Sequence, residues 1–102
     1  MAITNKSSGT LSASPTTLAA SVSPTNRLVK GIIIVNNDSV QHTVSVTCGE
    51  KFIQILLYPG DSMHHTTTVA LGSNNLTAVL SEAVVGTNPT YVVSWLDEAE
   101  TV

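Results

Sequence analysis

The sequence contains a series of short segments in which apolar and polar residues alternate. In residues 42–48, the side chains of Val44, Val46 and Cys48 alternate with Thr and Ser. Because successive side chains of a strand point to opposite faces, this pattern predicts a strand with one face turned to a core. Four more runs, bounded by turn residues, predict further strands at 51–58, 62–71, 75–84 and 90–97.

Residues 27–35 are apolar on both sides of the predicted strand. The two faces carry Leu28, Ile32 and Ile34 on one side and Val29, Ile33 and Val35 on the other. Strands that are covered on both faces lie inside a structure, so we expect this to be a central strand. The residues predicted to be buried include Ile32, Ile34, Val44, Val46 and Trp95.

Residues 1–26 differ from the rest of the chain because they are dense in Ser, Thr and Ala and are interrupted by Pro15 and Pro24. We therefore divide the chain into an N-terminal arm, residues 1–26, and a β-sandwich domain, residues 27–102. A short strand at 16–22 is compatible with an arm, since its flanking prolines fit the edge of a sheet. On this interpretation, removal of residues 1–24 leaves the domain folded.

No segment shows the roughly 3.6-residue apolar period of a helix. Val, Ile and Thr, which favour strands, account for 33 of the 102 residues. Turn sequences such as Gly49-Glu50 and Tyr58-Pro59-Gly60-Asp61 separate the strands. These features predict an all-β fold, an antiparallel β-sandwich of Ig-like or jelly-roll-like type with about seven or eight short strands and an N-terminal arm.

Charged residues are few, with four basic and seven acidic side chains and a formal net charge of −3. A nucleic acid or an anionic membrane needs a basic surface, so we expect neither as a partner. The first residues lack the apolar run of a signal peptide, and the aliphatic run at 32–35 is too short to span a bilayer. With a single cysteine, Cys48, we expect a protein that is made and used without export.

The residue types that most often carry chemistry do not form a recognisable set. His64 and His65 are adjacent, so on a strand they point to opposite faces and cannot hold one metal ion within a chain. Three copies of one of these histidines on a trimer axis are an open alternative. We expect His42 at the surface without a carboxylate partner, and Cys48 in the core as a small hydrophobe.

The sequence also contains no recognisable set of residues for nucleophilic or acid–base catalysis. The chain has no Gly-x-Ser-x-Gly motif, and its carboxylates are scattered or lie near the C-terminus. We therefore predict no catalytic, cofactor-binding or metal-binding residues, no cofactor, and a protein that is not an enzyme.

The order of features resembles that of small virion proteins encoded by tailed bacteriophages. The resemblance rests on a Ser/Thr-rich N-terminal segment, a strong strand at 27–37, a Thr/Val strand at 42–48 and a Pro/Gly/Asp turn at 58–61. It covers most of the chain as a pattern, and it implies a capsid decoration or cement protein, a head fibre, or an accessory part of the neck or tail. It carries over no catalytic residues.

On this resemblance, we expect a structural virion protein that binds and stabilises the outer capsid surface. Its expected partner is the major capsid protein, its expected oligomer is a homotrimer, and its expected location is the virion after synthesis in the bacterial host cytoplasm. The alternative is a receptor- or carbohydrate-binding sandwich of a phage fibre, neck or tail. That module needs aromatic and amide side chains at one site, for which the candidates are Phe52, Tyr58, Tyr91, Trp95, Asn74, Asn75 and Asn88.

Overall fold

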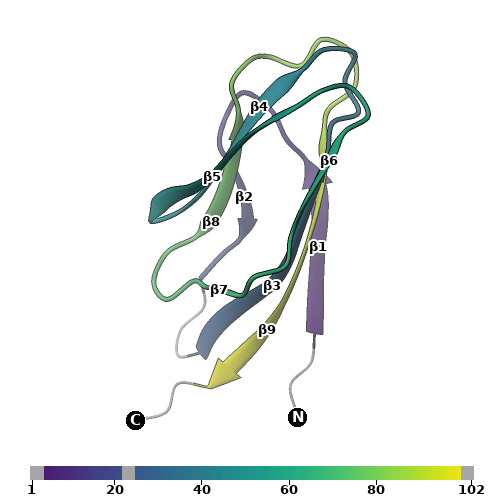
Figure 1. Cartoon of the computed structure of the whole chain (residues 1–102). Coiled ribbons are helices and arrows are strands. Elements are labelled where there is room, and N and C mark those ends of the chain that lie inside the picture. Colours follow the sequence, from purple (N-terminus) through teal and green to yellow (C-terminus); the bar gives the residue numbers. More distant parts are fainter. Residues whose placement is uncertain (1–3, 22–24, 100–102) are drawn as a thin grey trace.

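The computed structural model describes residues 4–21 and 25–99, which form two antiparallel β-sheets packed face to face (Figure 1). The larger sheet has the order β1 (Thr4–Thr10), β9 (Thr90–Ala99), β3 (Thr25–Val35) and β6 (Ser62–His65), and β7 (Val69–Ala70) also pairs with β3. The smaller sheet has the order β2 (Thr16–Ala19), β8 (Leu76–Leu80), β4 (His42–Cys48) and β5 (Glu50–Leu57). The prediction of an all-β antiparallel sandwich is confirmed. In this part of the chain, no helix is long and apolar enough to cross a membrane.

The chain passes repeatedly from one sheet to the other, which is the arrangement of a jelly roll. β1 and β2 lie in different sheets, and so do β3 and β4, β5 and β6, and β8 and β9. These four crossings lie at one end of the sandwich, the upper end in Figure 1, and β2 and β3, like β7 and β8, also lie in different sheets. In an Ig-like sandwich, several pairs of consecutive strands form hairpins within one sheet. Among the described strands of this chain, a single pair of consecutive strands, β4 and β5, forms such a hairpin. The strand order therefore favours the jelly-roll alternative.

Aliphatic side chains from both sheets fill the space between them. Ile32, Ile34, Val44 and Val46 are each 0% exposed, as the alternation predicted. Trp95 was predicted for the same core but is only partly buried and packs at its margin. The Arg27 guanidinium lies 4.6 Å from the centre of the Trp95 ring. One face of the indole therefore packs against a cation, which places Trp95 at the boundary of the core.

The structure corrects the division of the chain after residue 26. Residues 4–19 are not an arm, because β1 pairs along its length with β9 and β2 pairs with β8. Leu11 and Leu18 of this segment are 0% and 2% exposed, so they belong to the common core. β1 has the sequence TNKSSGT, and main-chain pairing holds it in the sheet without any apolar alternation. Removal of residues 1–24 is therefore expected to destabilise the whole sandwich.

A β-bulge changes the faces predicted for β3. The pairing of β3 with β9 shifts between Val29 and Gly31, so Val29, and not Leu28, joins Ile32 in the core and is 1% exposed. β3 lies inside its sheet, as predicted, but its outer face is open. Ile33 is 37% exposed, and Val92, its partner on β9, is 40% exposed.

The same bulge explains why the strand predicted at 62–71 is divided in two. β6 pairs with β3 from Ile32 onward, and β7 pairs with β3 at Leu28 and Val29. The interruption between β6 and β7 therefore lies beside the bulged part of β3. There, the Lys30 ammonium donates a hydrogen bond of 3.2 Å to the Thr68 hydroxyl.

The buried and exposed faces of β3 can be compared with one pair of matched substitutions. Ile34→Ala removes a fully buried side chain, so we expect the free energy of unfolding to fall by about 2–5 kcal/mol. Ile33→Ala removes the same atoms from the open face, and we expect less than half of that loss. Denaturant titration followed by circular dichroism measures both, and equal losses would show that the faces of β3 are assigned wrongly.

Candidate functional site

The outer face of the larger sheet carries a row of side chains that crosses β1, β9, β3 and β6. Ser8, Val92, Ile33 and His64 are register neighbours on β1, β9, β3 and β6. The next row consists of Thr10, Thr90, Val35 and Ser62. We call these eight residues the outer face. None is Asp, Glu, Lys or Arg, and the row is most apolar at its centre, where Ile33 and Val92 are exposed.

The two adjacent histidines point to opposite sides of β6, as predicted. His64 is exposed at the end of the outer face, where its Nε2 lies 3.2 Å from the Ser62 hydroxyl. His65 points to the inner side, and its ring meets that of Phe52 edge to face at 5.7 Å. Among the residues that the structure describes, no three His, Cys, Asp or Glu side chains are grouped as metal ligands.

The aromatic side chains do not form a sugar-binding platform. Tyr91 is buried in the core, Trp95 is covered by Arg27, and Tyr58 is 55% exposed at the turn that follows β5. Phe52 joins the edges of the two sheets through its contact with His65 on β6. The four rings thus lie in four separate places.

Two of the three amides that were candidates for the same site instead bond to the main chain. The Asn88 Nδ2 donates to the Leu11 carbonyl, at the end where the chain crosses between sheets. The Asn75 Oδ1 accepts from the Ser21 N–H, at the opposite end of the sandwich, and Asn74 lies beside Gly49 near the β4–β5 hairpin. They are structural residues of loops and are not gathered at one site.

Cys48 packs against the core, as predicted, although it is partly and not fully buried. Desolvation raises the pKa of its thiol above the ordinary value. A thiol with a raised pKa carries little thiolate at neutral pH, which makes Cys48 a poor nucleophile.

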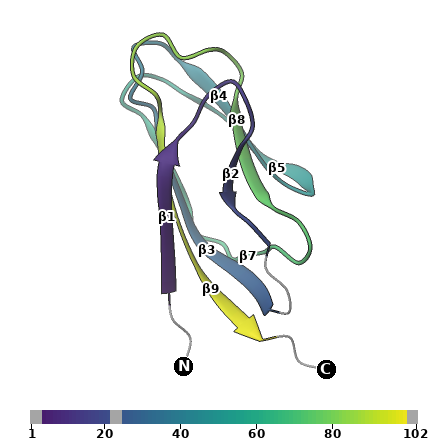
Figure 2. The same cartoon turned by 180° about the vertical axis from the view of Figure 1, so that it is seen from behind.

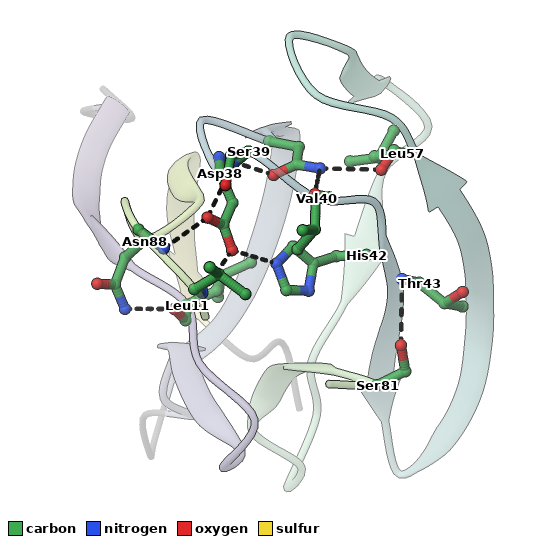
Figure 3. A network of polar contacts seen from close by, with 12 residues as sticks. Leu11, Asp38, Ser39, Val40, His42, Thr43, Leu57, Ser81 and Asn88 are labelled. Carbon is green, nitrogen blue, oxygen red and sulfur yellow. Dashed lines mark hydrogen bonds and ion pairs between the residues drawn. The ribbon is translucent and has the colours of Figure 1, made fainter. Parts of the chain in front are cut away.

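The most highly connected polar group is the carboxylate of Asp38, which is completely buried with His42 (Figure 3). The Asp38 Oδ2 lies 2.7 Å from the His42 Nε2 and accepts from the Val85 N–H at 2.9 Å. The Asp38 Oδ1 accepts from the Ser39 and Gly86 N–H groups, each at 2.8 Å. The expectation of a surface His42 without a carboxylate partner is therefore wrong, because Asp38 folds back to meet the first residue of β4.

These hydrogen bonds determine the charge of Asp38. The bond with His42, followed by those from Val85, Gly86 and Ser39, holds the pKa of this carboxyl well below its usual range, although burial acts in the opposite direction. An ionised carboxylate only accepts hydrogen bonds, so the His42 Nε2 carries a proton and donates it. The His42 Nδ1 is buried without a hydrogen-bond partner in the described part of the chain.

The sequence contains a signal for this network that lies outside the hydrophobic alternation. Asp38 and His42 are four residues apart across the predicted turn 36–39, and Asx side chains in turns commonly bond to nearby main-chain groups. The alternation within 42–48 also gives His42 the parity of the buried Val44 and Val46. The contacts to Val85 and Gly86 had no local signal, because they join positions more than 40 residues apart.

A shallow hollow of about 70 Å³ lies beside β5 and is lined by Gln41, Thr43, Leu56, Ser81 and Glu82. It is too small to enclose a metabolite. The feature best suited to bind a partner is therefore the outer face, and the fold and this face define the chain as a jelly-roll module with an uncharged patch on one of its sheets.

No protein-family model matches the chain, and no curated protein matches it. Among solved structures, the chain is similar to one described as "Bacillus endospore appendages form a novel family of disulfide-linked pili". The TM-score is 0.64 at 12% sequence identity, over 99% of this chain and 88% of that chain. At this level of identity the similarity extends to the fold alone.

Asp38→Asn tests whether the buried carboxylate stabilises the fold. Because its pKa is lower in the folded chain than in the unfolded chain, ionised Asp38 stabilises the fold at neutral pH, and this contribution is lost as the pH falls below about 4. We expect the variant to have a lower thermal midpoint than the wild type at pH 7, and a smaller decrease on acidification.

The control for this experiment is Asp97→Asn, since Asp97 also has a lowered pKa, owing to its ion pair with Arg27 at 2.8 Å. That pair is partly exposed, so its loss is expected to lower the midpoint less. Thermal melts at several pH values measure both variants. A midpoint of Asp38→Asn equal to that of the wild type at pH 7 would rule out the stabilising role.

Proposed function

We propose that this protein is a structural virion protein that binds the outer surface of an assembled capsid, as a decoration or cement protein, and that it has no enzymatic activity. The observation that supports a binding role is the outer face, where Ile33 and Val92 are exposed side by side among uncharged side chains. The centres of protein–protein interfaces are depleted in charged residues in the same way.

The assignment to a virion rests on the sequence resemblance, with the major capsid protein as the proposed partner. The fold is compatible with it, since jelly rolls are common in viral capsid proteins, although the same fold serves many functions. A sheet is also a suitable platform for this role, because β1, β9, β3 and β6 hold the outer face at fixed spacing.

A second candidate function is that of an appendage subunit, and the similarity to the spore-appendage chain favours it. Those appendages are described as disulfide-linked pili. A linear disulfide-linked polymer needs at least two cysteines in each subunit, and this chain has Cys48 alone. A polymer of this chain would therefore need non-covalent contacts. For this reason we rank the function of an appendage subunit below that of a capsid-binding protein.

The carbohydrate- or receptor-binding alternative loses its proposed site. The four aromatic side chains, Phe52, Tyr58, Tyr91 and Trp95, lie apart. Tyr91 is buried and Arg27 covers the ring of Trp95, so neither can stack on a sugar. Sugar recognition would need another set of residues.

Co-sedimentation of the purified protein with expanded capsids of its own phage tests the proposal. Contacts through an uncharged face do not depend on counterion release, so we expect saturable binding that persists at about 0.5 M NaCl. Val92→Ser places a polar side chain at the centre of the outer face, and we expect it to weaken binding at least about tenfold.

The matched control is Val85→Ser, because Val85 is 70% exposed in a loop and lies outside the outer face. It is expected to bind like the wild type, and circular dichroism verifies that both variants are folded. Equal binding by wild type and Val92→Ser would reject the outer face as the contact, and no binding of wild type to any capsid form would reject the capsid as the partner.

A further inference from the structure

The two sheets leave edge strands whose main chain faces outward. β5 and β2 are the edges of the smaller sheet, and β1 and the β6–β7 side are the edges of the larger sheet. Exposed edges tend to pair with strands of other chains, and soluble proteins protect them by charge, bulges or shortness. The four edges of this chain differ in that protection.

Three edges carry recognised protection. β1 contains Lys6 and no aliphatic side chain. β2 has four residues and an irregular register, and β6 and β7 have four and two residues separated by the interruption at 66–68. Each of them is a poor template for a partner strand.

β5 differs among the described strands, because charge and a bulge protect only its first half. It has eight residues, and its second half, Ile53 to Leu57, has the sequence IQILL without a charge, a proline or a glycine. Leu56 is 41% exposed on the outer side, while Ile53 and Ile55 point inward and are only partly buried. Figure 2 shows the β4–β5 hairpin standing out from the side of the sandwich, where a neighbour has access to it.

We propose that β5 pairs antiparallel with β5 of a second copy of this chain, around a two-fold axis at Gln54. In this register Gln54 lies opposite Gln54 of the partner subunit. Ile53 then lies opposite an isoleucine, Ile55, on the inner face, while Phe52, at the bulge, contacts His65 of the larger sheet and is not part of the regular pairing. The pairs Gln54–Gln54 and Ile53–Ile55 therefore join side chains of the same kind, and directly opposed pairs of this sort stabilise a sheet.

Neighbouring registers lack this match. An axis at Ile53 sets Lys51 against Ile55, and an axis at Ile55 sets Gln54 against Leu56. A shift of the pairing by one residue sets inward side chains against outward ones, which a sandwich with a buried face does not allow. The bulge of β5, between Lys51 and Ile53, falls at the end of the proposed pairing, where Lys51 lies opposite Leu57 and meets no like charge.

The pairing joins two smaller sheets into one continuous sheet and covers the inward-pointing Ile53 and Ile55 at their open edge. Such a contact uses the same surface on both copies and closes with two. It therefore predicts a dimer, where the sequence resemblance predicts a trimer. It leaves the outer face of each copy uncovered.

The test is a charge exchange at Gln54, an exposed position where a substitution leaves the core intact. We expect the wild-type chain to sediment as a dimer at tens of micromolar. Gln54→Lys and Gln54→Glu, each alone, place like charges opposite each other at the two-fold axis, and we expect each to raise the dimer dissociation constant at least about tenfold. An equimolar mixture of the two is expected to form a heterodimer, seen by native mass spectrometry.

Thr17→Lys is the control, because it adds the same charge to β2, at an exposed position on another edge. It is expected to remain dimeric. A wild type that stays monomeric at these concentrations or forms a trimer would overturn the proposal. So would a dimer that tolerates both substitutions, or a mixture that fails to form the heterodimer. Capsid binding is measured separately, so its outcome does not decide this one.

Discussion

The sandwich depends on a polar network that fastens its crossing segments to one another. Asp38 lies between β3 and β4, and its carboxylate binds the main chain between β8 and β9 through Val85 and Gly86. Asn36 of the same segment bonds to the Leu57 carbonyl, and Asn88 bonds to the Leu11 carbonyl, where β1 leads into β2. One cluster thus joins the four crossings at this end of the sandwich, and this explains why a buried charge is tolerated at the end of an aliphatic core.

This concentration of polar groups at one end has a consequence for the rest of the surface. Because the loops there are bound to each other, and Asn36, Asp38 and His42 are buried, little of their hydrogen-bonding capacity is free for a ligand. The available surfaces are those of the sheets, namely the outer face around Ile33 and the edge at β5. Both are suited to other protein surfaces more than to small molecules.

The sequence predicted the elements whose burial alternates and missed those held by other forces. The bounds of β4 agree with the predicted 42–48, because Val44 and Val46 alternate strictly with polar residues. β1 was missed because main-chain pairing with β9 holds it in place and leaves no apolar pattern. The bulge in β3 and the Asp38 contacts depend on partners distant in the sequence, which a local period does not encode. In the outer face, the sequence identified Ile33 as an apolar strand residue. It could not show that Ile33 is exposed, because that depends on which side of β3 the other sheet covers.

The proposed dimer and the proposed capsid contact support each other geometrically. When a strand pairs antiparallel with its own copy in one continuous sheet, the two-fold axis is perpendicular to that sheet, so both copies turn the same side outward. The two smaller sheets then face one way, and the two outer faces, with Ile33 and Val92, face the other way. Such a dimer presents two identical uncharged faces to a single repetitive surface. Binding of the second face is intramolecular, so two contacts that are each weak together give strong attachment without any charge.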